Sequence, residues 1–113
     1  MLIFIISLEH FYIMWIEMFS WTKMGKKVFK SIPEDLFEKT KGLAANQGLY
    51  NGFLAVGLLW SIFEKNVDFS KNISIFFLGC IIVAGIYGAI SSDKKIFFKQ
   101  GLPALLVMIK ILM

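Results

Sequence analysis

Three titratable side chains, Glu9, His10 and Glu17, interrupt the first apolar stretch of the sequence. On an ideal helix, with about 100° between residues, they share one arc with Ser20 and Trp21, opposite an arc of aromatic and aliphatic residues. A carboxylate at the centre of a membrane helix costs roughly 2.5–3.5 kcal/mol on insertion scales, so this arc is expected to face protein or water. Side chains of these types could transfer a proton or bind a polar or cationic group.

A second polar group lies in the stretch from residue 44 to 63 and contains two asparagines, a glutamine and a tyrosine. Beside them, small residues on one arc of the helix would let another helix approach closely. This small arc consists of Ala44, Gly48, Gly52 and Ala55. The opposite, bulky arc is expected to face lipid and consists of Leu49, Phe53, Val56 and Trp60. The carboxamides near the small arc could therefore form hydrogen bonds with Glu17.

Antiparallel helices would bring these polar groups to similar depths in a bilayer. With a rise of 1.5 Å per residue, Glu17 would lie roughly 6 Å below the cytoplasmic edge and Asn51 roughly 12 Å, with His10 close to the midplane. Polar atoms from all four apolar stretches would then converge in the cytoplasmic half. The predicted polar network or ligand-binding site consists of His10, Glu17, Asn46, Gln47, Tyr50, Asn51, Tyr87 and Gln100.

Three interpretations of these residues remain open. A satisfied hydrogen-bond network would hold Glu17 either protonated or paired with Lys99 and would set the helix register. A pocket open to the cytoplasmic side would use Glu17 and His10 to bind a small amphiphile. Catalysis would use either side chain as an acid or base on a lipophilic substrate. We favour a non-enzymatic protein that binds or passes such an amphiphile, with a membrane-embedded enzyme and a structural or accessory subunit as the alternatives.

The sequence predicts neither a metal site nor a cofactor. One histidine and two carboxylates on a single helix do not form a convincing ligand shell. The chain also lacks a Ser-His-Asp set, a phosphate-binding loop and a dinucleotide-binding motif. Cys80 is the one cysteine, so an intramolecular disulfide and a thiolate metal cluster are excluded.

The composition predicts an integral membrane protein. Of its 113 residues 58% are hydrophobic, and its mean hydropathy is +0.71. Four apolar stretches each approach the ~20 residues that span a bilayer. They cover residues 2–21, 43–63, 73–90 and 96–113. We therefore expect one all-α domain over residues 1–113, folded as an up-down bundle of four transmembrane helices. The first stretch lacks a basic leader and a cleavage site and is expected to be a retained span.

The basic residues, all twelve of them lysines, predict the orientation. Most lie in the first and third connections, which the positive-inside rule places in the cytoplasm, with both termini outside. The net charge of +4 reflects these loops, so no nucleic-acid partner is expected. The expected location is a bacterial cytoplasmic membrane, with membrane lipids as partners.

Two further features concern the connections and the packing of the spans. Ser31 to Glu34 matches a capping box with Pro33 in its first turn, which predicts a short interfacial helix over about residues 32–40 in the first cytoplasmic loop. Small residues at a spacing of four, such as Cys80 and Ala84, predict helix-packing surfaces in the third span. A kink or a delayed helix start is expected near Gly101 and Pro103. The small-residue faces favour a homo-oligomer.

Four strings of sequence carry a family resemblance: HFYIMWIEMFSW at 10–21, AANQGLYNGFLAVGLLW at 44–60, IIVAGIYGA at 81–89 and QGLPALL at 100–106. Through them nearly the whole chain resembles the bacterial and fungal membrane family known as domain of unknown function 1304. The resemblance implies a small integral membrane protein with four spans and no assigned activity.

The architecture is also similar, more weakly, to the membrane-associated eicosanoid and glutathione metabolism proteins. These have four spans, an outside N-terminus, a long first cytoplasmic loop and an asparagine near the start of span two. They use arginines to hold and activate glutathione, and this chain contains no arginine. Lysine cannot supply the same bidentate contacts, so the resemblance does not extend to glutathione chemistry by that route.

Overall fold

The computed structural model describes residues 2–113, which are helical throughout apart from short turns and contain no strand. Four long helices carry the architecture: α1 (Leu2–Phe19), α4 (Lys41–Phe63), α5 (Val67–Ser91) and α6 (Leu102–Leu112). Shorter helical segments fill the connections: the π-helical η1 (Trp21–Gly25), α2 (Lys26–Val28), α3 (Leu36–Lys39) and the π-helical η2 (Phe97–Gly101). The all-helical prediction is confirmed.

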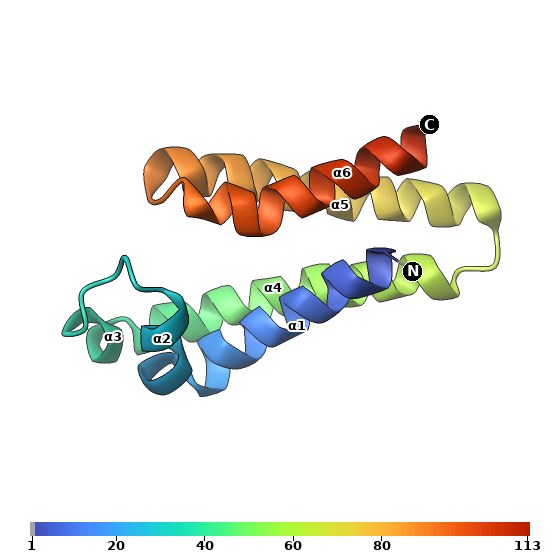
Figure 1. The fold of residues 1–113 in the computed structure, drawn as a ribbon. Coiled ribbons are helices and arrows are strands. Elements are labelled where there is room, and N and C mark those ends of the chain that lie inside the picture. Colours follow the sequence, from blue (N-terminus) through green and yellow to red (C-terminus); the bar gives the residue numbers. More distant parts are fainter. Residues whose placement is uncertain (1) are drawn as a thin grey trace.

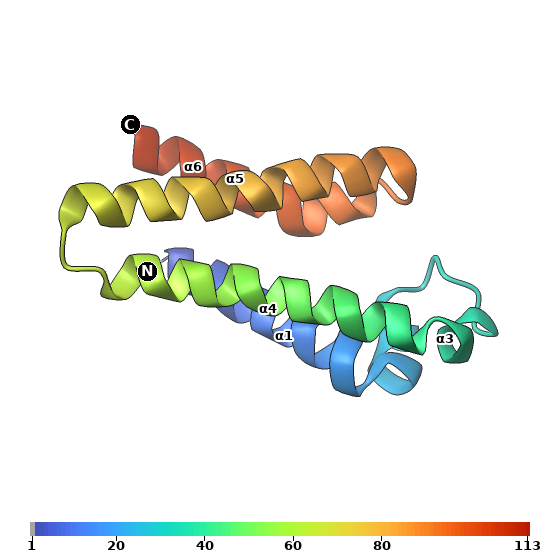
Figure 2. The ribbon, with the colours of Figure 1, turned by 180° about the vertical axis from the view of Figure 1, so that it is seen from behind.

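The helices form two antiparallel hairpins that lie one above the other (Figure 1). One hairpin pairs α1 with α4, and the other pairs α5 with η2 and α6. The view from behind shows the short turn from α4 to α5 at the end where both termini lie (Figure 2). The connection between α1 and α4 and the turn between α5 and η2 lie together at the other end. The two lysine-rich connections therefore share one end of the molecule.

Small residues bring α1 and α4 into close contact, as the sequence predicted. A Cβ added to Gly48 would lie 2.7 Å from Met18 Cγ and 3.1 Å from the Met14 carbonyl oxygen. The Ser7 hydroxyl donates a hydrogen bond of 2.8 Å to the Ala55 carbonyl. All four residues of the small arc are buried, and all four of the bulky arc are exposed. The burial predicted for the small arc and the exposure of the bulky arc are thus confirmed.

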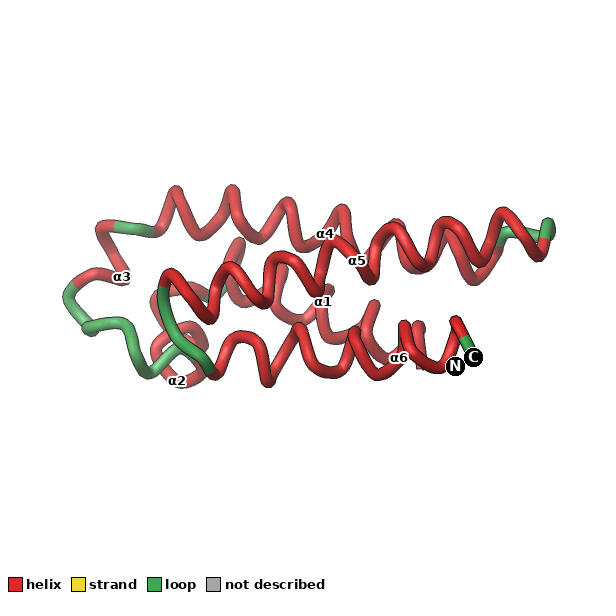
Figure 3. Tube along the Cα trace, turned by 90° about the horizontal axis from the view of Figure 1, so that it is seen from above, coloured by secondary structure: helices red, strands yellow, loops and turns green. Residues whose placement is uncertain are grey.

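The two hairpins meet through an apolar cluster near the end that carries the termini. Its buried members come from α1, α4, α5 and α6, and they are Ile6, Leu58, Leu78, Ile81, Ala104 and Val107. The Phe77 ring covers Gly57, where an added Cβ would clash with it. Viewed from above, the axes of the long helices lie roughly along one direction (Figure 3). This cluster holds one end of the two layers together.

The α5–η2 contact is made by backbone rather than by side chains. A Cβ added to Gly85 would lie 2.9 Å from the Gly101 Cα and 3.0 Å from the Gly101 nitrogen. The chain reaches this contact through the π-helical η2, and Pro103 follows in the first turn of α6. A π-helical segment is one of the known ways to bend a helix, so the irregularity expected near Gly101 takes this form.

The helix predicted over residues 32–40 is wrong at its start. Residues 29–35 form turns, and α3 begins only at Leu36, with the Phe37 amide donating to the Glu34 carbonyl at 3.3 Å. Instead, helical structure continues past α1 into η1 and α2. The Phe37 ring packs on Trp21, with ring centroids 4.8 Å apart. This contact between distant residues outweighs the local capping signal at Ser31.

The third predicted span also begins earlier than expected, because α5 starts at Val67 instead of residue 73. Asn66 caps it by accepting a hydrogen bond of 2.9 Å from the Phe69 amide. Two described helices, α1 and α5, are long and apolar enough to cross a membrane by length and composition. The 23-residue α4 carries more polar residues in its first half, and α6 has 11 residues.

Candidate ligand-binding site

A cavity of about 620 Å³ lies between the two hairpins. Its walls come from α1, α4, α5 and η2, and the connection between α1 and α4 contributes further residues. The polar side chains in its lining are His10, Glu17, Gln47, Tyr50, Asn51, Tyr87 and Gln100. Seven of the eight predicted polar residues therefore border one cavity. Asn46 is the exception, because it is exposed on α4 and is absent from this lining.

These side chains differ in how deeply they are buried. His10, Glu17 and Asn51 are buried, and they lie on the facing surfaces of α1 and α4. Tyr50 and Tyr87 are 56% and 71% exposed, so they border the cavity at its rim. The buried group is thus confined to the α1–α4 hairpin, while α5 and η2 supply the opposite wall.

Glu17 and Asn51 form the central polar contact. The Asn51 Nδ2 atom donates a hydrogen bond of 2.6 Å to the Glu17 Oε1 atom. The alternative partner considered for Glu17, Lys99, is not its partner here, since no lysine lies within ion-pair distance of Glu17 in residues 2–113. The contact joins α1 to α4. It is a hydrogen bond of the kind that the sequence suggested between Glu17 and a carboxamide of α4.

His10 presents an unpaired nitrogen at this site. Its side chain is fully buried, and its Nδ1 lies 3.0 Å from the Ile6 carbonyl oxygen. A carbonyl only accepts, so Nδ1 carries the proton and Nε2 of the neutral ring is an acceptor. Within residues 2–113 Nε2 has no hydrogen-bond partner. Leaving such a group unpaired costs about 1–3 kcal/mol, which a donor on a ligand or water would offset.

Comparison with known proteins places the chain in a family. The family model described as a protein of unknown function (DUF1304) matches residues 4–112. The chain belongs to this family. It is also 36% identical to the uncharacterized protein YpaA of Lactococcus lactis subsp. lactis (strain IL1403), over 93% of this chain and 88% of that protein. No solved structure matches the chain. The family resemblance seen in the sequence is confirmed.

The small residues of α5 in this DUF1304 chain have a role that the sequence pattern did not predict. Cys80 and Ala84 were expected to be packing surfaces, yet both line the cavity. Gly85 and Gly88 do pack closely, Gly85 on the Gly101 backbone and Gly88 on the Ile96 side chain. The spacing of four residues was visible in the sequence, but small side chains can either allow another helix to approach or leave a cavity beside the helix. Only the position of the opposing helix distinguishes these outcomes.

Aromatic and aliphatic residues of the α1–α4 connection close the cavity at its lysine-rich end. Trp21, Phe29 and Ile32 belong to the lining. The Trp21 and Phe29 rings are tilted by 51° to one another, with centroids 5.3 Å apart, and the Trp21 Nε1 donates a hydrogen bond of 3.0 Å to the Thr40 hydroxyl. These apolar residues give the cavity an amphipathic wall that the polar residues alone did not predict.

The arrangement can bind polar groups from two sides. Glu17 and the His10 Nε2 atom accept hydrogen bonds, whereas the carboxamides and tyrosine hydroxyls can donate or accept. Residues 2–113 hold no group of three or more histidine, cysteine, aspartate or glutamate side chains suited to a metal ion. The site as described is therefore built for hydrogen bonding beside an apolar surface.

Proposed function

We propose that this DUF1304 protein is a multi-pass protein of the bacterial cytoplasmic membrane that binds or passes a small amphiphile in the cavity between its two hairpins. The observation that carries the proposal is the fully buried His10, which lines a cavity of about 620 Å³ and whose Nε2 has no hydrogen-bond partner within residues 2–113. This volume lies within the roughly 300–1,000 Å³ typical of small-molecule sites. The ligand offers a hydrogen-bond donor and an apolar portion.

The distribution of side chains supports the membrane part of the proposal. Large apolar residues are exposed along all four long helices, while Ser7, Ser61, Ser74 and the three deepest cavity residues are inside. A soluble monomer rarely exposes so much contiguous apolar surface. With 23 residues, α4 is about 34 Å long and can cross the hydrocarbon layer. We propose that α4 and the η2–α6 segment complete a four-span bundle with both termini outside.

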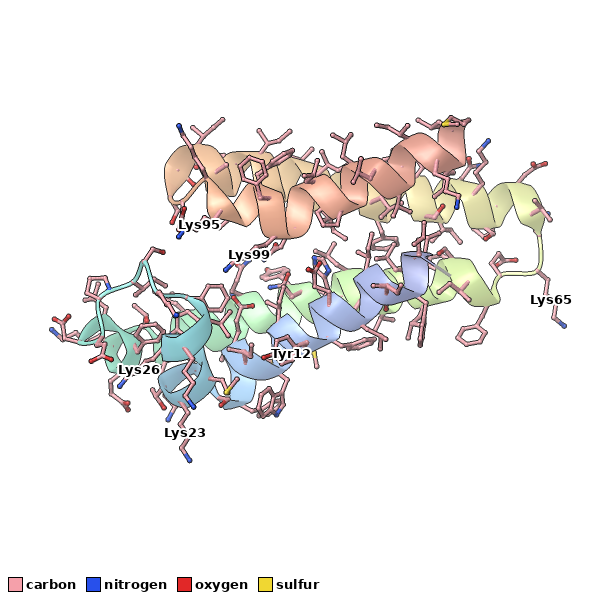
Figure 4. The ribbon with its side chains drawn as sticks, viewed as in Figure 1. Tyr12, Lys23, Lys26, Lys65, Lys95 and Lys99 are labelled. Carbon is pink, nitrogen blue, oxygen red and sulfur yellow. The ribbon has the colours of Figure 1, made fainter. Side chains whose placement is uncertain are left out.

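The topology can be tested with single cysteines. In a Cys80→Ser background, a membrane-impermeant maleimide is expected to label Lys65→Cys in intact cells, because this exposed residue lies in the turn between α4 and α5. Figure 4 shows Lys65 pointing away from the helices. The Lys94→Cys variant, at the opposite end, is expected to react only after lysis. Equal labelling of both in intact cells would contradict the proposed orientation.

Ligand retention tests the role of the cavity. Glu17→Gln and Asn51→Leu are each expected to lower the amount of lipid that co-purifies with the detergent-extracted protein by about tenfold, since each removes a polar contact of the order of 1.5 kcal/mol. Native mass spectrometry measures the retained lipid. The melting temperature is expected to change by only a few degrees.

Matched controls are available at exposed positions. Glu38→Gln and Asn46→Leu make the same chemical changes at residues outside the cavity lining, and they are expected to retain the lipid. A large loss of stability from both Glu17→Gln and Asn51→Leu, with no lipid bound to the unmodified protein, would instead support a structural network. The chain would then act as an accessory subunit.

His10 also favours a second candidate function, a membrane-embedded enzyme acting on a lipophilic substrate. His10 lines the cavity, and a neutral imidazole whose Nε2 has no other partner is a suitable general base. Under this alternative, the unmodified protein would convert the lipid that it binds, and His10→Gln would retain it unchanged. The same mass spectra distinguish a bound ligand from a converted one.

A further inference from the structure

A second hollow, of about 360 Å³, lies at the lysine-rich end of the molecule. It is formed between the segment that follows α2 and the turn that joins α5 to η2. Phe29, Ile32 and Ile96 line both this hollow and the larger cavity. The two spaces therefore adjoin one another along these three apolar side chains.

Four lysines line this second hollow, which we call the lysine pocket. Lys27 and Lys30 come from the α1–α4 connection, and Lys95 and Lys99 come from the α5–η2 turn and η2. Figure 4 shows Lys95 and Lys99 directed from the upper hairpin towards the lower one. Their positive charges are thus supplied from both layers and meet over one space.

Only one carboxylate, that of Asp93, lines the lysine pocket. The Lys95 amide donates to Asp93 Oδ1 at 3.0 Å, and this bond, with the nearby charges of Lys95 and Lys99, holds the pKa of Asp93 below its usual value. Asp93 is therefore ionised at neutral pH. No carboxylate in residues 2–113 lies within ion-pair distance of the four ammonium groups. Four positive charges against one negative charge leave an unbalanced attraction for an anion.

Lysines in cytoplasmic loops also set membrane orientation, but that role does not require them to surround a hollow. Lys23 and Lys26 lie in the same connection and would serve orientation equally well. In Figure 4 they extend away from the upper hairpin, and neither lines the pocket. The chain thus has two sets of lysines with the same charge and different placement.

We propose that the lysine pocket binds the anionic group, a phosphate or carboxylate, of an amphiphile whose remaining part enters the cavity along Phe29, Ile32 and Ile96. This inference rests on the proposed function and specifies its ligand class. Ammonium groups bind phosphate as point charges without a fixed bidentate geometry. The ligand would be an acidic lipid or lipid precursor, with its donor group near Glu17 and His10.

Three compounds separate the sources of the anion: lysophosphatidic acid, the monoacylglycerol with the same acyl chain, and inorganic phosphate. Titrations of the full chain in an uncharged detergent, followed by native mass spectrometry, give apparent Kd values. Lysophosphatidic acid is expected to bind about tenfold more tightly than the monoacylglycerol, as several exposed charge pairs of modest strength act together. Tight binding of inorganic phosphate alone would show that the pocket serves a free anion and would overturn the lipid assignment.

The variants Lys95→Gln/Lys99→Gln and Lys23→Gln/Lys26→Gln remove equal charge. The first variant is expected to raise the apparent Kd of lysophosphatidic acid about fivefold and to leave that of the monoacylglycerol unchanged. The second is expected to change neither Kd by more than about twofold. Equal effects of the two variants, or none from either, would overturn the lysine pocket. If lysophosphatidic acid and monoacylglycerol bind equally well, the inference fails while the proposed amphiphile function stands. Binding of neither lipid would overturn both.

Discussion

Replacing Gly85 with alanine is expected to destabilise the protein by about 2 kcal/mol, within the range for overpacking a tight contact. The added Cβ would lie 2.9 Å from the Gly101 Cα and 3.0 Å from its nitrogen. Backbone atoms cannot rotate away as the end of a side chain can, so α5 and η2 must separate. The measurement is the free energy of unfolding in mixed micelles titrated with a denaturing detergent.

The control for this prediction lies on the same helix. A Cβ added to Gly79 would meet only Met108 Cε, at 3.8 Å, which is ordinary contact. Gly79→Ala is therefore expected to be neutral or to stabilise by about 0.5–1 kcal/mol, since alanine has the higher helix propensity. If the two variants were equally stable, α5 and η2 would not lie as close together as described. The position of the η2 residues that line the cavity would then also be incorrect.

Filling the cavity is expected to have the largest effect on ligand binding. In Gln100→Trp, an indole replaces a half-buried carboxamide that belongs to the cavity lining. Accommodating a ligand beside it would cost about 1–3 kcal/mol, which corresponds to roughly 5–150-fold in Kd. The melting temperature is expected to stay the same or rise, because the indole occupies empty space. Native mass spectrometry and thermal denaturation measure the two effects.

Phe98→Trp provides the matched control. Phe98 lies on the same π-helical segment, is 63% exposed and is absent from the cavity lining. This variant is expected to bind ligand as the unmodified protein does. If Gln100→Trp bound as tightly as Phe98→Trp, the ligand would lie elsewhere and the cavity would have no part in binding. The comparison does not depend on knowing the natural ligand, since the co-purifying lipid serves as the readout.

The faces of the helices were the most predictable part of the fold. On α4 the small and bulky arcs were read from a period of 3.6 residues, and both have the predicted burial. On α1 the buried His10 and Glu17 lie on the predicted polar arc, and Ser20 and Trp21, which follow the helix, are buried as well. Periodicity works here because it depends only on the helix itself and on which side is covered.

The first connection was predictable only in part, because its structure depends on contacts between distant residues. The Ser31–Glu34 pattern would cap a helix if local hydrogen bonds alone decided where the helix begins. Instead, Phe37 is buried against Trp21, and Trp21 also donates to the Thr40 hydroxyl. The burial of two aromatic rings outweighs one cap, which contributes about 1 kcal/mol.

The sequence by itself determined the helical class, the family, the buried faces of α1 and α4, and the set of polar residues at similar depths. These follow from composition, periodicity and recognisable strings, which are properties of the chain read in order. Only the tertiary structure decided that Asn51 is the partner of Glu17, that Cys80 and Ala84 face a cavity, and that Gly85 meets the Gly101 backbone. Each of these depends on the distance between two helices, and no pattern within one helix encodes that distance.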